Sequence, residues 1–317
     1  MERGVYQIAG ASPGRSHVDV FLACGVALIP PGDGGPWSEQ RYAYDFAIAG
    51  FVRRFAEEMQ VGDILLLRTD RSTIRAVGIV ASDYLYLDQF DDVNGLDFQH
   101  ARRVRWFCLP SEYTFATPVF GASPTRCSRV QNADARDFAL RFVESAPTHW
   151  QTAPLPELPP EDPRLDAIPV DLRDVVAQVG DLVPLYLAGD SFGAQPNEHE
   201  LVAHLVVPFL HALGWRPEQI AVEWRHIDAA LFRELPRTPE HCHLVIEAKR
   251  LGAGVEGALE QAKGYVRKLG VARDVVVTDG QRYRMYDARA DFAPIAYANL
   301  ARLKQPASDL FARMRRP

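Results

Sequence analysis

Cysteine is scarce in this sequence, and its spacing excludes the common cysteine-based sites. Four cysteines occur among 317 residues, and no two of them form a CxxC pair. A disulfide framework needs a denser pattern and a zinc module needs paired ligands, so neither is expected. His241 and His243 flank one cysteine, but that spacing fits no standard zinc pattern. The cysteines, which we expect to be free thiols in a reducing cytoplasm, are Cys24, Cys108, Cys127 and Cys242.

Long hydrophobic runs are also absent. No stretch of 18 apolar residues occurs, and the N-terminal segment MERGVYQIAG lacks the apolar core of a signal peptide. A helix that crosses a membrane needs about 20 such residues. We therefore expect a cytoplasmic protein without a membrane-spanning helix.

An excess of positive charge and a phosphate-binding loop are missing as well. The chain has 35 Lys and Arg against 41 Asp and Glu, which gives a formal net charge of −6. A site for nucleic acid must therefore be a local basic patch. The GxxxxGK[S/T] pattern does not occur, so we expect no ATP-driven translocation.

The length and the proline distribution predict two domains. A prior of about 150 residues per domain suggests two for this chain. Prolines crowd residues 146–169, where they fix φ and remove backbone donors, which indicates an extended connector. We expect a first domain at 1–145, a connector at 146–195 and a second domain at 196–317. The helical part of the connector, 165–190, is either a dimer surface or a spacer.

The second domain is expected to be a mixed sheet with helices packed on it, within the α/β (α+β) class. Apolar residues recur at every fourth position from Leu201 to Leu213, which favours a helix that Gly214 ends. Asp279-Gly280 joins two strand patterns and is typical of a hairpin turn. The expected order α-β-β-α-β-β runs through 198–215, 220–232, 243–251, 254–270 and 274–287.

Three charged residues lie inside the predicted strands of this domain. Glu247 and Lys249 share one face of the strand HLVIEAKRL because side chains alternate, and Asp228 lies inside the preceding strand pattern. Buried charges cost several kcal/mol unless they are paired or hold a metal. If the two strands pair, Asp228 lies beside Glu247, and two carboxylates suit Mg²⁺ or Mn²⁺. Lys249 would orient or deprotonate a water, or stabilise negative charge.

An ordinary structural interpretation stands beside this one. Asp228 and Glu247 would then be charges at the edge of a sheet, and Lys249 would form a salt bridge with Glu247. His226, which shares the expected strand face of Asp228, is either a polar residue at the sheet rim or a contact for a ligand.

These residues and their order resemble the PD-(D/E)xK nuclease superfamily, in particular the N-terminal nuclease domain of type I restriction-enzyme motor subunits. The matching segments, within 196–290, are VVPFLHALGW, IDAAL, LVIEAKR, ALEQAKGY and VVVTDGQRYRMYD. The resemblance implies a metal-dependent phosphodiesterase that cuts DNA. It makes Asp228 and Glu247 ligands of Mg²⁺ or Mn²⁺, places Lys249 beside the nucleophile, and gives Gln261 a role in positioning the scissile backbone.

The same resemblance implies a further metal-ligating glutamate from the first helix. Glu200 is favoured because it precedes the apolar stripe that begins at Leu201, and Glu198 is the alternative. Ile227 departs from the family pattern, which often has proline before the aspartate.

The first domain is expected to be a small, β-barrel-like domain. A hairpin is predicted within 61–88, and ARRVRWF at 101–107 reads as a further strand with basic residues. The segments FLACGVALIP, GPW, VGDILLLR, IRAVGIVASDYLY and HARRVRW resemble the EVE-like branch of the PUA-like superfamily over about residues 5–125. That resemblance implies nucleic-acid binding, with a flipped and often modified base held in an aromatic pocket.

Four aromatic residues are candidates for that pocket: Trp37, Tyr84, Tyr86 and Trp106. The alternative for each of them is a place in the core. Three basic residues on the predicted strand, Arg102, Arg103 and Arg105, are candidates for phosphate contacts. Their alternative is a solvated strand face.

Together these expectations describe a modification-dependent (type IV-like) DNA endonuclease, a defence protein whose first domain senses a modified base and whose second domain cuts nearby. One active site per chain suggests a homodimer for cleavage of both strands. Two alternatives remain open at this point. One is a nuclease released when the first domain binds a nucleotide signal, and the other is a non-catalytic nucleic-acid-binding protein.

Overall fold

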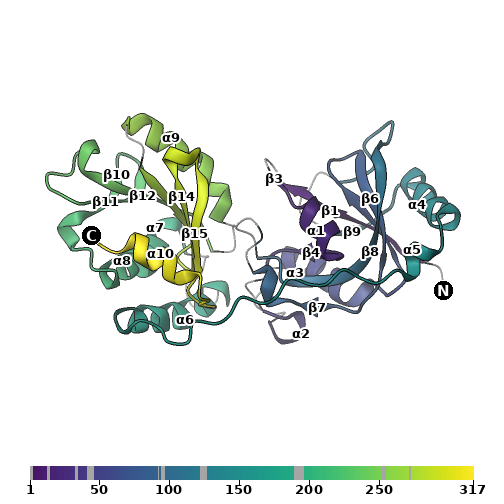
Figure 1. The fold of residues 1–317 in the computed structure, drawn as a ribbon, viewed down its shortest axis with the longest axis horizontal. Coiled ribbons are helices and arrows are strands. Elements are labelled where there is room, and N and C mark those ends of the chain that lie inside the picture. The colour runs from purple at the N-terminus through teal and green to yellow at the C-terminus, as the bar shows by residue number, and fades with distance from the viewer. Residues whose placement is uncertain are drawn as a thin grey trace. The chain divides into compact units, whose positions relative to one another are not determined.

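The protein consists of two compact units, which a computed structural model describes over residues 3–12, 15–32, 35–40, 46–91, 93, 97–121, 127–188, 196–251, 255–270 and 273–317. The first unit extends to Glu161 and the second begins at Asp162. In Figure 1 the first unit is coloured from purple to teal and the second from teal to yellow. The expected connector 146–195 is therefore divided between the units, and its residues 189–195 lie outside the described part.

A seven-stranded sheet forms the centre of the first unit. Its order is β4-β8-β6-β5-β1-β9, with β7 paired to β8, and β1 runs parallel to β5 whereas the other pairs are antiparallel. The described strands leave β4 and β9 as open edges, so they do not close a barrel. The bounds are β1 Val5–Ala9, β4 Val26–Ile29, β5 Ile64–Arg68, β6 Thr73–Val80, β7 Leu85–Tyr86, β8 His100–Thr114 and β9 Ser128–Arg129.

The hairpin predicted within 61–88 is confirmed as the antiparallel pair β5 and β6. Asp70 shapes its turn, because the Asp70 carboxylate accepts hydrogen bonds from the backbone N–H groups of Ser72 at 2.6 Å and Thr73 at 2.8 Å. An aspartate that bonds to the backbone two residues later is a common turn device.

Helices and one short ribbon complete the first unit. Helix α4 packs against the sheet through Ala135, Ala139 and Val143, together with buried Trp150 of α5. Residues 146–161, expected to be connector, are thus anchored by an aromatic core contact. The bounds are β2 Ala11–Ser12, β3 Arg15–Ser16, α1 Val18–Cys24, α2 Trp37–Gln40, α3 Phe46–Arg53 with a π-helical continuation Arg54–Glu58, a 3₁₀ turn Asp88–Phe90, α4 Ala133–Ser145 and α5 His149–Thr152.

A six-stranded mixed sheet forms the centre of the second unit, in the order β10-β11-β12-β13-β14-β15. Strands β12 and β13 are parallel and the other neighbours are antiparallel. Two mixed sheets with packed helices agree with the predicted α+β class. The bounds are β10 Ile220–Trp224, β11 Ile227–Phe232, β12 Cys242–Ala248, β13 Asp274–Thr278, β14 Arg282–Asp287 and β15 Ala293–Asn299.

Helices cover both faces of this sheet, as the left half of Figure 1 shows. One face packs against α6 (Arg173–Ala188), α10 (Ala307–Met314) and a helical segment made of α7 (Glu198–Leu201), a π-helical turn (Val202–Val206) and α8 (Val207–Ala212). The other face packs against α9 (Leu259–Leu269). Among the described residues, no helix combines the length and apolarity needed to cross a membrane.

The segment 220–232 differs from its prediction as one strand, because it folds into the hairpin of β10 and β11. The turn residues Arg225 and His226 have positive φ values of 54° and 69°. Two such residues make a hairpin turn, but Gly or Asn normally signals it. His226 consequently lies in the turn and not on the strand beside Asp228. Strand β15 was also unpredicted, and it forms the sheet edge opposite β10.

The turn predicted at Asp279-Gly280 is confirmed between β13 and β14. Gly280 has φ +84°, and a Cβ there would lie 2.7 Å from the Leu205 side chain. Next to it, Arg282 is 2% exposed and its Nε donates to Asp279 Oδ2 at 2.9 Å, while Asp279 is fully buried. This ion pair fixes the turn inside the core.

We expect Arg282→Met to lower the free energy of unfolding of the second unit by about 3 to 5 kcal/mol, because it leaves Asp279 as an uncompensated buried charge. Urea denaturation followed by circular dichroism measures this change. Arg289→Met is the matched control, since Arg289 forms its ion pairs at the exposed surface. Equal, small effects of both substitutions would show that the buried pair contributes little.

Candidate functional site

The pairing of β11 with β12 brings two of the predicted carboxylates together. Ala229 pairs with Ile246 in the antiparallel register, and the next step places Asp228 opposite Glu247. Both side chains lie on the face that α9 covers, because Val245, two residues before Glu247, packs with that helix. Asp228 Oδ2 also accepts a hydrogen bond from Ala248 N at 2.7 Å. The two strands thus pair as the predicted site requires, with Asp228 beside Glu247.

Glu247 is fully buried, and its carboxylate is only partly satisfied. Oε1 accepts a hydrogen bond from Lys249 Nζ at 2.7 Å, whereas Oε2 is buried and has no hydrogen-bond partner within the described chain. Burial raises the pKa of Glu247 to about 7, against the lowering effect of Lys249 and with a further rise from Asp228. Burial likewise raises the pKa of Asp228.

Lys249 is the positive centre of this group. Burial acts to lower the pKa of Lys249, but the hydrogen bond to Glu247 and the negative charges of Glu247, Glu198 and Asp228 raise it above its ordinary value. Lys249 Nζ lies 4.0 Å from Glu198 Oε2 and its side chain is 22% exposed. The ammonium group therefore stays protonated at neutral pH and remains accessible.

The first helix contributes Glu198 to the group, although the sequence favours Glu200. The Glu200 carboxylate instead closes a capping box, in which Oε2 accepts from Asn197 N at 3.0 Å and Asn197 Oδ1 accepts from Glu200 N at 2.9 Å. The spacing Asn197-x-x-Glu200 is the known signature of that cap and could have revealed it.

Two other residues complete the surroundings. Gln261 is exposed on α9, where its Nε2 donates to Tyr265 Oη at 2.8 Å, and no contact with the carboxylates is recorded for it in the described chain. Glu223 of β10 is a residue that the sequence did not reveal. It raises the pKa of Asp228 as a minor contribution and pairs with His199 Nδ1 at 3.0 Å.

The donor set determines which metal could fit. In the ranges that the structure describes, no three His, Cys, Asp or Glu side chains are close enough to hold an ion. Mg²⁺, however, is usually bound by one or two carboxylates and takes its remaining ligands from water and phosphate. Asp228 and Glu247, with one unsatisfied buried oxygen, fit that requirement.

In the first unit, two of the four predicted pocket aromatics, Tyr84 and Tyr86, meet around His100. Tyr84 Oη lies 2.7 Å from His100 Nδ1 and accepts from Trp37 N at 3.1 Å. The Tyr84 and Tyr86 rings lie 5.8 Å and 5.6 Å from the imidazole of His100. Burial raises the pKa of Tyr84 to about 12. His100, which is fully buried, escaped the sequence analysis because nothing marks it in the sequence.

Trp37 and Trp106 have largely structural surroundings. Trp37 is 8% exposed, and its Nε1 donates to Glu57 Oε1 at 2.7 Å. Trp106 Nε1 donates to Val26 O at 2.9 Å, and its ring lies over Gly78 in the neighbouring strand. Trp106 thus packs on the sheet, apart from the His100 cluster.

The three predicted phosphate-binding arginines bond to the protein's own backbone. Arg102 is 2% exposed and donates to the carbonyls of Phe55, Ser82 and Ala56, so its guanidinium is not available to a phosphate, contrary to the prediction. Arg103 donates to Pro156 O, and Arg105 Nε donates to Ala153 O at 2.8 Å. These two side chains fasten the proline-rich segment to β8.

The chain shows limited similarity to known proteins. A family described as a domain of unknown function (DUF8426) matches residues 38–117. No curated protein matches the chain. Among solved structures, the chain is similar to one described as a fragment of an HsdR subunit of a type I restriction enzyme from Vibrio vulnificus, with 21% identity and a TM-score of 0.27. That similarity covers 38% of this chain and 25% of the other, so the chain spans about a quarter of that protein.

We expect the stability of the second unit to depend on pH through Glu247. The pKa of Glu247 is about 7 in the folded chain, against an ordinary value of 4.5. The contribution of the neutral carboxyl group to the free energy of unfolding is therefore fully present below pH 4.5 and is lost as the pH rises through 7. Between pH 5 and 8, the free energy of unfolding of the wild type should fall by on the order of 3 kcal/mol relative to that of Glu247→Gln.

Urea denaturation at several pH values in EDTA measures this difference. Glu260→Gln, which removes an exposed carboxylate of α9, should keep the wild-type pH dependence. Parallel curves for wild type and Glu247→Gln would contradict the raised pKa.

Proposed function

We propose that the second unit is an endonuclease that hydrolyses phosphodiester bonds in DNA with Mg²⁺ or Mn²⁺. The observation that carries this proposal is the buried Glu247 carboxylate, which lies opposite Asp228, bonds to Lys249 and keeps one oxygen without a partner. A buried, half-satisfied carboxylate is costly unless a cation compensates it. The order of motifs that resembles the PD-(D/E)xK superfamily supports the same chemistry.

Asp228 and Glu247 would hold the cation in this proposal. When bound, the cation would polarise the phosphate oxygens and make a bound water a better nucleophile. Ala248 N orients the Asp228 carboxylate by its hydrogen bond, and the β11–β12 pairing keeps both carboxylates on one face. Gln261, on the helix that covers this face, would help to position the DNA backbone.

Lys249 would stabilise negative charge in this reaction. The sequence left open whether Lys249 accepts a proton from water or stabilises charge, and the contacts of its ammonium group with Glu247 and Glu198 support the second role. A protonated ammonium has no lone pair with which to accept a proton, but it can donate hydrogen bonds to a phosphate oxygen whose charge increases. Glu198, 4.0 Å from the ammonium, would help to hold it in place.

The first unit would supply recognition of a modified base. Tyr84 and Tyr86 meet around His100, and Tyr84 also accepts a hydrogen bond from the backbone N–H of Trp37, so the cluster combines aromatic surface with hydrogen-bonding groups. A flipped base is typically read by stacking and by hydrogen bonds to its Watson–Crick edge. The protein would then be a modification-dependent endonuclease, acting as a homodimer to cut both strands.

We expect Asp228→Ala and Lys249→Ala each to reduce DNA cleavage at least about 100-fold while leaving DNA binding largely intact, because they remove a cation ligand and a charge-stabilising group. Single-turnover cleavage in Mg²⁺ and a gel-shift assay in Ca²⁺ measure the two properties. Lys268→Ala, on the exposed side of α9, should cut like wild type. Wild-type cleavage by either Asp228→Ala or Lys249→Ala would show that the site is assigned wrongly.

We also expect cleavage to require a modified base, because the first unit would bind it before the second unit cuts. Matched unmodified, methylated and hydroxymethylated duplexes incubated with Mg²⁺ measure this preference. Tyr86→Ala should remove the preference, whereas Tyr113→Ala, at an exposed position of β8, should keep it. Equal cleavage of all duplexes would refute modification sensing, and cleavage only after a nucleotide is added would favour the signal-controlled nuclease.

A further inference from the structure

A second charged site lies at the other end of the sheet that carries Glu247. Arg233 directly follows β11, His243 lies at the start of β12, and Arg273 directly precedes β13. Because β11 is antiparallel to β12 and β12 is parallel to β13, these three positions meet at one end of the sheet. They line a cavity of about 260 Å³, whereas Glu247 stands near the opposite end of β12.

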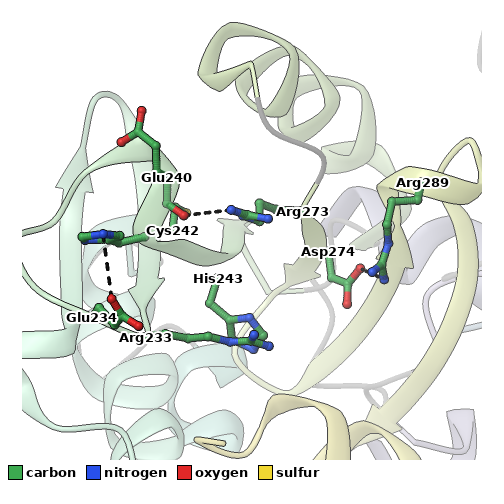
Figure 2. Close-up of a pocket in the computed structure, with 9 residues that line it drawn as sticks. Arg233, Glu234, Glu240, Cys242, His243, Arg273, Asp274 and Arg289 are labelled. Atoms are coloured by element: carbon green, nitrogen blue, oxygen red, sulfur yellow. Dashed lines mark hydrogen bonds and ion pairs between the residues drawn. The ribbon is translucent and has the colours of Figure 1, made fainter.

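Two positive side chains face one imidazole in this cavity. Figure 2 shows the guanidinium of Arg233 beside the ring of His243, with Arg273 above it. Burial, followed by the charges of Arg233 and Arg273, lowers the pKa of His243 to about 4. The ring of Trp215 lies 5.6 Å from the His243 ring and supports it from the core. His243 is therefore a neutral, fixed hydrogen-bonding group between two cations.

The carboxylates that line the cavity form no ion pair with Arg233, His243 or Arg273 in the described chain, and two of them pair with other lining residues. Asp274 pairs with Arg289 at 3.1 Å, and Glu234 lies 4.0 Å from His241. Glu240 reaches Arg273 only through its backbone carbonyl, at 2.8 Å.

The two guanidiniums consequently keep unused donors. In the chain as described, the Arg233 side chain has no hydrogen bond or ion pair, and Arg273 Nε is buried without a hydrogen-bond partner. An anion that enters the cavity could accept charge-assisted hydrogen bonds from these unused donors.

We propose that the cavity formed by Arg233, His243 and Arg273 binds a phosphate group, either as inorganic phosphate or as the phosphate of a nucleoside monophosphate. The planar fork of the Arg233 guanidinium matches two phosphate oxygens, Arg273 adds positive charge, and the imidazole N–H adds a further donor. The cavity is smaller than the 300 to 1,000 Å³ typical of drug-sized ligands, which suits a compact anion. This site is separate from the proposed nuclease centre and does not depend on it.

Calorimetric titration of the full chain with inorganic phosphate, adenosine monophosphate and adenosine, at constant ionic strength, tests the proposal. Phosphate and the monophosphate should bind and adenosine should not. Similar affinities for phosphate and the monophosphate would identify the phosphate group as the whole ligand, and an affinity at least tenfold higher for the monophosphate would identify a nucleotide. Binding of neither at about 10 mM would overturn the proposal.

Variants locate the binding. Arg233→Gln and Arg273→Gln should each weaken it at least about tenfold, because each removes a charge-assisted hydrogen bond. Arg233 is exposed, so its replacement should leave the fold intact even if that of Arg273 does not. Arg267→Gln is the charge-matched control and should bind like wild type. Binding unchanged by Arg233→Gln would place the anion elsewhere and refute the assignment.

Proton NMR provides an independent readout. Phosphate should raise the pKa of His243, which is seen as a shift of its ring resonance and is assigned by its loss in His243→Asn. Asp228→Ala should keep phosphate binding, so a failed nuclease assay and a failed phosphate titration are distinguishable. A His243 resonance that does not move on saturation with phosphate would contradict the proposal.

Discussion

The register of β11 against β12 is the constraint on which the second unit's chemistry depends. Successive strand residues face opposite sides, so a slip by one residue would turn Asp228 away from Glu247 and into the layer packed by α6 and α10. The register is fixed by buried apolar neighbours, such as Ala229 with Ile246 and Leu231 with Leu244. The apolar core therefore selects which carboxylates meet, and the chemistry of the site follows from packing.

Strand β12 has opposite electrostatic character at its two ends. Its beginning lies among Arg233 and Arg273, which suppress protonation of His243, and its end lies among carboxylates that suppress ionisation of Glu247. In both places burial is the largest cause of the pKa shift. The two arginines add to the shift at His243, whereas at Glu247 Lys249 opposes it and Asp228 adds to it. A sheet covered on both faces leaves its strand ends as the places where charged groups can gather, and this sheet uses both ends.

The sequence predicts that the charged strand residues form a site, because burying unpaired charges is costly. It also predicts the hairpins at Asp70 and Gly280, because their turn residues are specific. It fails where the deciding interaction is remote. The turn at Arg225 contains no glycine, and Glu200 forms a helix cap with Asn197 in place of a contact with the other carboxylates. The arginines of β8 look like a basic surface in the sequence, yet in the fold each of them donates to a backbone carbonyl more than 40 positions away.

The turn between β10 and β11 has a consequence for any partner that approaches it. Arg225 and His226 are held at positive φ, which costs each of them about 1 kcal/mol, and the Arg225 guanidinium lies 4.9 Å from the centre of the Trp224 ring. The strand pairing on both sides of the turn and the Arg225–Trp224 contact hold the tip in this conformation. A partner that docks there meets a shape that is already set, and little conformational entropy is lost on contact.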